Sequence, residues 1–270
     1  MNESNNKGIG TYLKSIWLVF SFYKYQGRKI RRTKLFFIVG ILPVIMAIII
    51  KLTNIISHNI NVRGLLIFSN MIMVFYLQFF ILILALFYGT SICSEEVEGK
   101  TLTYLTTRPI SKSSVILGKY MAYTFIIMVI VVTGVVFSFV ILNAENLLDW
   151  SIYKILFRDL GVLILGLICY TALFAFLGTF LKKSVLFGVI YCFGWESVIQ
   201  YFPGSTQKFT IVHYLKSLLP EHAPEHFSFL IFRLDRSSVA TSITILFVMT
   251  AVFLLLASLI FVNKEYILED

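Results

Sequence analysis

Long apolar runs limit this chain more than any other feature. A membrane-crossing helix needs about 20 consecutive, mostly apolar residues. Apolar residues form 58% of the chain and charged residues only 14%, against a soluble norm of about 25% charged residues. We therefore predict an all-α integral membrane protein with six spans, of which the second is long and the first and fifth are short. The predicted spans are Leu35–Ile50, Leu65–Ile92, Tyr120–Leu142, Leu160–Leu181, Val185–Tyr201 and Val239–Val262.

The basic residues predict the orientation of these spans. Eight of the 23 Lys and Arg residues precede position 35, and loops on the cytoplasmic side are typically rich in Lys and Arg. We expect both termini to be cytoplasmic in a multi-pass protein of the cell membrane. The domains are then a cytoplasmic N-terminus at 1–34, a transmembrane domain at 35–262 with a large outer loop at 202–238, and a tail at 263–270.

Several other classes of function lack support in the sequence. No basic stripe with interleaved aromatic residues lies outside the apolar runs, so we expect no nucleic-acid partner. The three cysteines form no CxxC pair, which disfavours a disulfide framework or a zinc site. The two histidines of the outer loop, His222 and His226, flank Pro224, which disfavours a helical metal site. We expect no metal and no catalytic residue.

The segment from Tyr12 to Tyr23 has helical apolar spacing. Leu13, Ile16, Trp17, Phe20 and Tyr23 recur at intervals of three or four residues, and Lys14 and Ser21 occupy other positions. This pattern predicts an amphipathic helix in the headgroup plane. Two interpretations stay open, namely a general membrane-surface anchor and an elbow helix that packs against a partner subunit.

The inner loop between the second and third predicted spans has helical signals. Glutamates at its start favour a helix N-terminus, Pro109 ends the helix, and Ser111 can cap the next one. We predict a short helix at about 94–108. Val97, Thr101, Tyr104, Leu105 and Arg108 share one of its faces. Such a semi-apolar knob, attached to two spans, is suited to docking a protein partner.

The same loop carries a family resemblance. Its residues read Glu95-Glu96-x-x-Gly99-x-x-Leu102-x-x-Leu105-x-x-Arg108-Pro109-x-Ser111, followed by Gly118-Lys119. This pattern resembles the signature of type 2 ABC transporter permeases, the membrane subunits of many exporters. Thr103 departs from the pattern, because many relatives carry an acidic residue there.

The resemblance implies partners and site residues. The loop would be the cytoplasmic coupling helix, which docks on a separate ATPase subunit through Glu95, Glu98, Gly99, Tyr104, Leu105, Arg108 and Pro109. Two ATPase subunits would bind ATP and Mg, and a second permease chain, identical or different, would complete the pore. The chain itself would carry no cofactor. Consistently, Gly99-Lys100-Thr101 lacks the first glycine of a P-loop, since residue 94 is Ser.

Three residues inside the apolar runs are candidates for the transport pathway. Glu196 is the one acidic residue well inside a predicted span, where a carboxyl group should face protein or water. It either lines the pathway or hydrogen-bonds a neighbouring span. Because the second and fifth spans flank the path in the resembling family, Tyr76 and Gln78 are further candidates. The alternatives to a permease are a stand-alone secondary transporter and a membrane anchor that does not transport.

Overall fold

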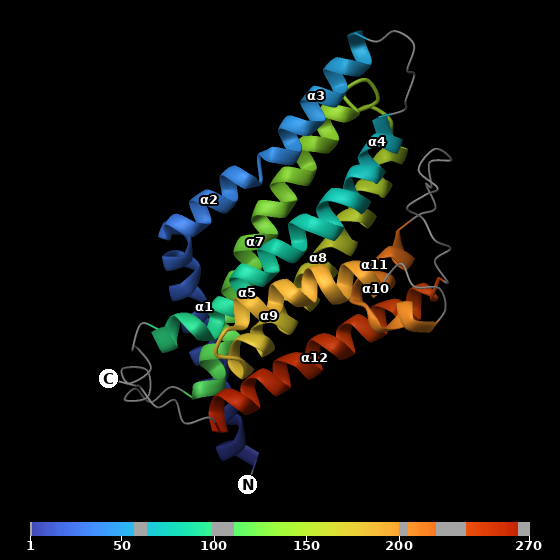
Figure 1. The fold of residues 1–270 in the computed structure, drawn as a ribbon. Coiled ribbons are helices and arrows are strands. Elements are labelled where there is room, and N and C mark those ends of the chain that lie inside the picture. Colours follow the sequence, from blue (N-terminus) through green and yellow to red (C-terminus); the bar gives the residue numbers. More distant parts are fainter. Residues whose placement is uncertain (1, 57–63, 99–110, 200–204, 220–235, 264–270) are drawn as a thin grey trace.

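The computed structural model describes residues 2–56, 64–98, 111–199, 205–219 and 236–263, and in these it is helical without strands (Figure 1). Five helical segments of the described chain are long and apolar enough to cross a membrane. They are Arg31–Thr53, Gly64–Cys93, Lys112–Leu142, Trp150–Phe180 and Val239–Asn263. A sixth apolar helical segment, Ser184–Ile199, is shorter. The all-α fold of a multi-pass membrane protein is therefore confirmed, with five helical segments of membrane-crossing length, while the sixth span stays a prediction.

Helices α7 (Lys112–Leu142) and α8 (Trp150–Phe180) form the longest hairpin of the bundle. Each has 31 residues and is therefore about 47 Å long at 1.5 Å per residue, more than the ~30 Å of a hydrocarbon core. Both helices begin before the predicted membrane spans, which start at Tyr120 and Leu160. The apolar run marks only the part of the helix that can lie in the membrane, and polar turns such as the first turn of α7 continue the helix beyond it. Asp149 caps α8 by accepting a hydrogen bond from the Ser151 amide at 3.1 Å.

Helix α5 (Ile81–Glu98) packs closely against α8. Small residues permit this approach, as in many membrane helix pairs. A Cβ atom at Gly178 would lie 2.7 Å from the carbonyl oxygen of Thr90, and one at Gly89 would lie 2.6 Å from the Cβ of Phe174. The glycines therefore set the distance between α5 and the last turns of α8.

Two helical segments contain π-helical turns. Helix α4 (Gly64–Met71) continues through the π-helix η1 (Ile72–Phe80) into α5, and α9 (Ser184–Ile190) continues through η2 (Tyr191–Glu196) into α10 (Ser197–Ile199). The two π-helices lie near each other, because the rings of Phe79 and Phe193 meet edge to face at 5.9 Å. Such insertions occur frequently at functional sites.

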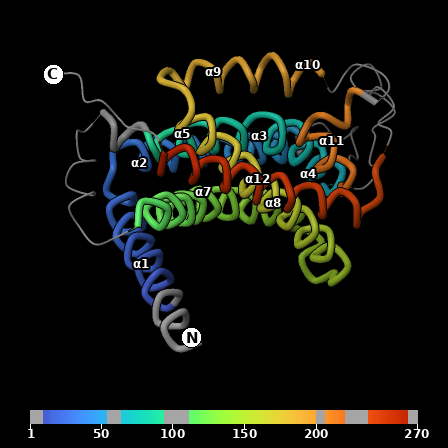
Figure 2. Tube along the Cα trace, turned by 90° about the horizontal axis from the view of Figure 1, so that it is seen from below, coloured from blue at the N-terminus to red at the C-terminus, as the bar shows by residue number. Residues whose placement is uncertain are grey.

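Helix α1 (Asn2–Lys29) lies across one end of the bundle, where it contacts α7 (Figure 2). The apolar residues of this helix do not all lie on one side in the structure. Val19 and Phe20 are buried, whereas Leu13 and Trp17 are exposed. The helix therefore has an inner apolar side that packs on protein and an outer one that does not, a distinction that residue spacing alone could not make.

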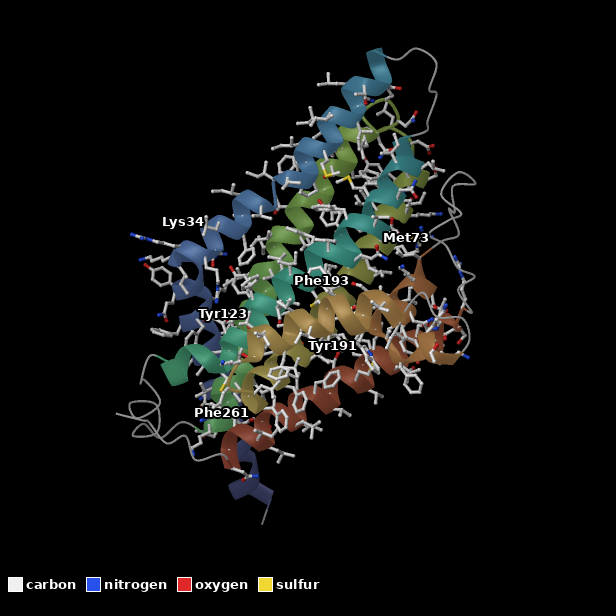
Figure 3. The ribbon with its side chains drawn as sticks, in the orientation of Figure 1. Lys34, Met73, Tyr123, Tyr191, Phe193 and Phe261 are labelled. Atoms are coloured by element: carbon white, nitrogen blue, oxygen red, sulfur yellow. The ribbon has the colours of Figure 1, made fainter. Side chains whose placement is uncertain are left out.

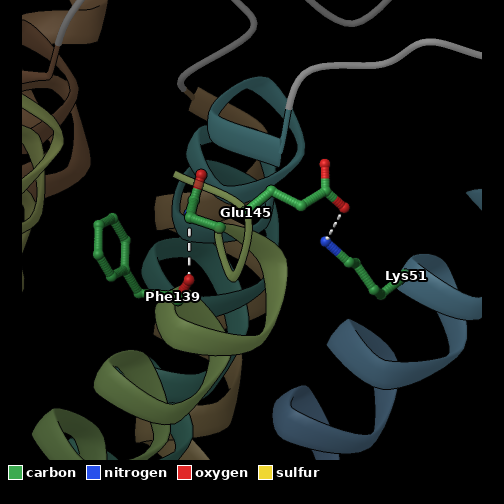
Figure 4. Close-up of polar contacts among 4 residues, drawn as sticks. Lys51, Phe139 and Glu145 are labelled. Carbon is green, nitrogen blue, oxygen red and sulfur yellow. Dashed lines mark hydrogen bonds and ion pairs between the residues drawn. The ribbon is translucent and has the colours of Figure 1, made fainter. Parts of the chain in front are cut away.

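The opposite end of the bundle holds the α7–α8 turn and the end of α3 (Leu42–Ile56), which follows α2 (Arg31–Val39). There the ammonium group of Lys51 pairs with Glu145 at 2.8 Å (Figure 4).

A 3-10 helix, η3 (Ser205–Phe209), leads into α11 (Ile211–Leu218), which is packed against α8 and α12 (Val239–Asn263). Helix α11 is largely buried between these two helices.

Candidate functional site

The ends of α5 and α7 define the base of the predicted docking loop. Figure 1 places the end of α5 and the start of α7 at one end of the bundle, beside α1. Ser111 is the N-cap residue of α7, as its position after Pro109 predicts. Its hydroxyl group hydrogen-bonds the Ser114 hydroxyl at 2.6 Å. We call residues 92–98 and 111–119 the stem.

Most of the predicted docking residues lie outside the described residues. Gly99, Tyr104, Leu105, Arg108 and Pro109 belong to the segment 99–110. Glu95 and Glu98 lie in the last turn of α5, at the edge of that segment. The sequence pattern places these glutamates at the start of a separate helix at about 94–108, whereas the structure places them at the end of α5, because α5 continues through Glu98. The rest of the predicted helix lies outside the described residues, and the docking role stays a prediction.

Lys119 joins the two sides of the stem. Its side chain is buried, with 1% exposure, and its ammonium group donates a hydrogen bond to the carbonyl oxygen of Ile92 at 3.1 Å. The same ammonium lies 4.6 Å from the ring centre of Tyr23 in α1 and 5.9 Å from that of Tyr123, both within cation–π range. One side chain therefore connects α5, α7 and α1.

Two further contacts hold α1 against the start of α7. A Cβ atom at Gly118 would lie 2.6 Å from Val19, so only glycine permits the helices to cross this closely. The Tyr12 hydroxyl donates a hydrogen bond to the Ser113 hydroxyl at 3.1 Å. The stem and α1 therefore form one packed unit.

A second cation near this unit also lies among aromatic rings. The guanidinium carbon of Arg32 lies 4.6 Å from the ring centre of Tyr88 and 5.9 Å from that of Tyr123. The Tyr88 hydroxyl donates to Thr33, whose own hydroxyl donates to the Gly27 carbonyl oxygen. These contacts connect the junction of α1 and α2 to the second membrane-crossing helix.

Glu196 accepts three hydrogen bonds where η2 meets α8 and the first turn of α11. The hydroxyl groups of Tyr170 and Tyr191 donate to its carboxyl oxygens at 2.5 and 2.8 Å, and the Val212 amide donates at 2.6 Å. Its side chain has 1% exposure. Thr210, the N-cap residue of α11, makes no side-chain cap. Glu196, which lies 16 residues from Val212 in the sequence, instead accepts a hydrogen bond from an amide in the first turn of α11.

The other two pathway candidates lie on η1. Tyr76 is fully buried and its hydroxyl group lies 3.4 Å from that of Ser138. Gln78 is partly exposed. The structure brings η1 close to η2, which carries Glu196, but Tyr76 and Glu196 are enclosed within the single chain.

Sequence reasoning did not identify the partners of Glu196 or the contacts of Lys119. Tyr191 precedes Glu196 by five residues, which places the two side chains on different sides of an α-helix. They fall on one side here because the π-helix η2 pairs residues five apart. The available signal was the presence of tyrosines in the same apolar runs as the buried carboxyl group. Within the described residues, no group of three or more His, Cys, Asp or Glu side chains could hold a metal ion.

Comparison with known proteins identifies the family. Residues 27–194, more than half of the chain, match the family model described as ABC-2 family transporter protein. No curated protein matches the chain. The matched region extends from the last residues of α1 through the stem to η2, so it includes Lys119 and its contact with Ile92. Most of α1, Glu196, α11 and α12 lie outside it. The chain therefore belongs to the ABC-2 transporter family and is a multi-pass permease of the ABC-2 type.

Proposed function

We propose that this chain is the permease subunit of an ATP-driven exporter and that it couples to a separate ATPase through residues 94–111. The observation that carries the proposal is the stem, which holds the two ends of this segment to each other and to α1. A docking loop transmits movement only if its base is rigid. The motif in the loop and the family match support the same function.

The stem would transmit force from a docked ATPase into the bundle. A push on residues 99–110 would act on α5 and α7 together, because Lys119 joins them. It would also move α1, which packs on Gly118. Since α5 packs closely on α8, the displacement would continue as a rigid-body movement of packed helices.

The chain would form half of a translocation pathway. Two copies, or this chain and a sister chain, would pair, and two ATPase subunits would bind ATP and Mg below them. The segment Ser184–Ile199 would be the sixth span, with both termini on the cytoplasmic side. Gln78 would line this pathway, whereas Tyr76 and Glu196, which are buried within the chain, would reach it only if the surrounding helices moved apart. Gln78 is the best placed of the three, because its side chain already reaches the protein surface.

Purification from the native cells tests this proposal. The tagged chain in mild detergent should retain a stoichiometric P-loop ATPase, and the Glu98→Arg variant combined with Arg108→Glu should lose it. Lys182→Glu with Lys183→Glu is the matched control, because these exposed residues lie between α8 and α9 at the same end of the bundle. The control should retain the ATPase.

Two outcomes would count against the proposal. A chain that carries no ATPase, even after crosslinking, would favour a stand-alone secondary transporter. An ATPase that binds while vesicles show no ATP-dependent transport of any cargo would favour a membrane anchor.

A further inference from the structure

The corner between α1 and α2 exposes four cationic side chains. Arg28 and Lys29 end α1, and Arg31 and Lys34 lie in the first turns of α2, all exposed. Lys34 lies at the outer edge of this corner (Figure 3). The chain has no Asp or Glu between Glu3 and Glu95. Within the described part of the chain, none of the four cations pairs with a carboxyl group.

The outer side of α1 exposes a stripe of large apolar side chains next to these cations. Trp17 is 66% exposed, and Tyr25, one turn before the corner, is also 66% exposed. The stripe consists of Leu13, Trp17, Leu18, Phe22 and Tyr25. A shallow groove runs along it, lined by the same residues with Lys14 and Ser21. Apolar and cationic side chains thus share one exposed side of the helix.

The position of the corner relative to the membrane identifies what covers this surface. The first membrane-crossing segment begins at Arg31, directly after α1. The four cations therefore lie where the chain enters the membrane, at the depth of the phospholipid headgroups. Trp and Tyr side chains are enriched at this depth. The exposed stripe can reach the upper acyl chains while the cations face phosphate groups.

We propose that the outer side of α1 and the α1–α2 corner form a binding surface for anionic phospholipids. The charge of the four cations is complementary to an anionic headgroup layer and is not compensated within the described chain. Each cation near an anionic surface strengthens attraction by up to about fivefold. Anionic lipid should therefore be enriched around α1 relative to zwitterionic lipid, independently of any ATPase partner.

Quenching of Trp17 fluorescence by brominated lipids tests the proposal on the full chain. Replacing Trp150 and Trp195 with Phe leaves Trp17 as the only tryptophan. The protein is reconstituted in phosphatidylcholine vesicles that contain either brominated phosphatidylglycerol or brominated phosphatidylcholine at equal mole fraction. We expect the anionic quencher to associate with Trp17 with at least about threefold preference.

Two variants separate charge from structure. Replacing the four cations with Gln should abolish the preference, whereas exchanging Arg for Lys and Lys for Arg at the same positions should preserve it. The variant Lys182→Gln with Lys183→Gln, which removes exposed cations elsewhere, should also preserve it.

Salt provides a test that needs no change at the corner. Raising the ionic strength from about 0.1 to 1 M shortens the screening length from about 10 to 3 Å, and the preference should fall toward unity. Equal quenching by the two lipids at low salt would overturn the proposal. A preference that persists in the Gln variant or at high salt would also overturn it.

Discussion

Replacement of Glu196 with Leu should detach α11 from the bundle. Leu has a similar size but accepts no hydrogen bond, so the hydroxyl groups of Tyr170 and Tyr191 and the amide of Val212 would lose their acceptor. A buried donor without an acceptor costs about 1–3 kcal/mol. The tyrosine hydroxyls can rotate toward other acceptors, which places them at the low end of this range.

The total cost follows from these three contacts. About 1 kcal/mol for each tyrosine, together with the cap of α11 at about 1–2 kcal/mol, predicts a loss of about 3–4 kcal/mol for Glu196→Leu. This corresponds to a decrease in Tm of roughly 6 to 16 °C. Glu196→Gln should cost only about 1 kcal/mol, because its carbonyl oxygen still accepts two of the hydrogen bonds.

Hydrogen exchange of the purified chain measures the effect where it should occur. Backbone amides of 211–218 should exchange faster in Glu196→Leu, while those of α7 should change little. Glu145→Gln removes an exposed carboxyl group and is the control that should leave α11 unaffected. Adding Tyr170→Phe to Glu196→Leu should recover about 1 kcal/mol, because it removes an orphaned donor. Unchanged protection of α11 in Glu196→Leu would refute the reasoning.

Three further predictions concern the helix contacts, the stem and an ion pair. Gly178→Ala should lower stability by about 1–3 kcal/mol, because its new Cβ meets backbone. Gly161→Ala in the same helix, with open space around it, should be neutral or stabilising by up to about 1 kcal/mol in thermal unfolding. Lys119→Met should reduce the ATP hydrolysis coupled to transport more than Lys119→Arg, which retains the charge; equal activity of both would argue against the stem as a transmitter. The hydrogen bond from Lys51 lowers the pKa of Glu145 below 4.5. The small contribution of this ion pair to the free energy of unfolding is therefore complete above pH 4.5, and it disappears as the pH falls through the lowered pKa. The Tm difference between native and Lys51→Gln protein should therefore vanish in acid, and a difference that grows in acid would contradict this sign.

The predictions from sequence were most accurate where a local pattern determines the structure. Apolar runs long enough to cross a membrane form helices because every backbone polar group must be satisfied internally there. The five long apolar helices follow this rule, although α7 and α8 begin about two to three turns before the predicted runs. Ser111 lies at the N-cap of α7 as its position after Pro109 predicts.

The loop motif was equally informative about the family. Its glycine, proline and charged residues occur within about 25 residues of each other, so their spacing is visible without any knowledge of the fold. The family match over 27–194 confirms that assignment. The docking contacts themselves stay predictions, because they depend on a second protein.

Contacts between distant segments could not be predicted from these patterns. Lys119 and Ile92 are 27 residues apart, and Tyr170 and Glu196 are 26 apart. The sequence shows that a lysine and a carboxyl group lie within or beside apolar runs, and elementary solvation requires that each has partners. It does not show which helix supplies them.

The sequence by itself therefore determined the membrane class, the helical elements and the family, because these depend on local composition and spacing. The tertiary structure decided which side of α1 is covered, how Tyr191 and Glu196 share one side of η2, and that one buried lysine joins the stem. The physical reason is that helix packing depends on close-fitting side chains and glycines from several segments at once. Their mutual positions exist only in the folded chain.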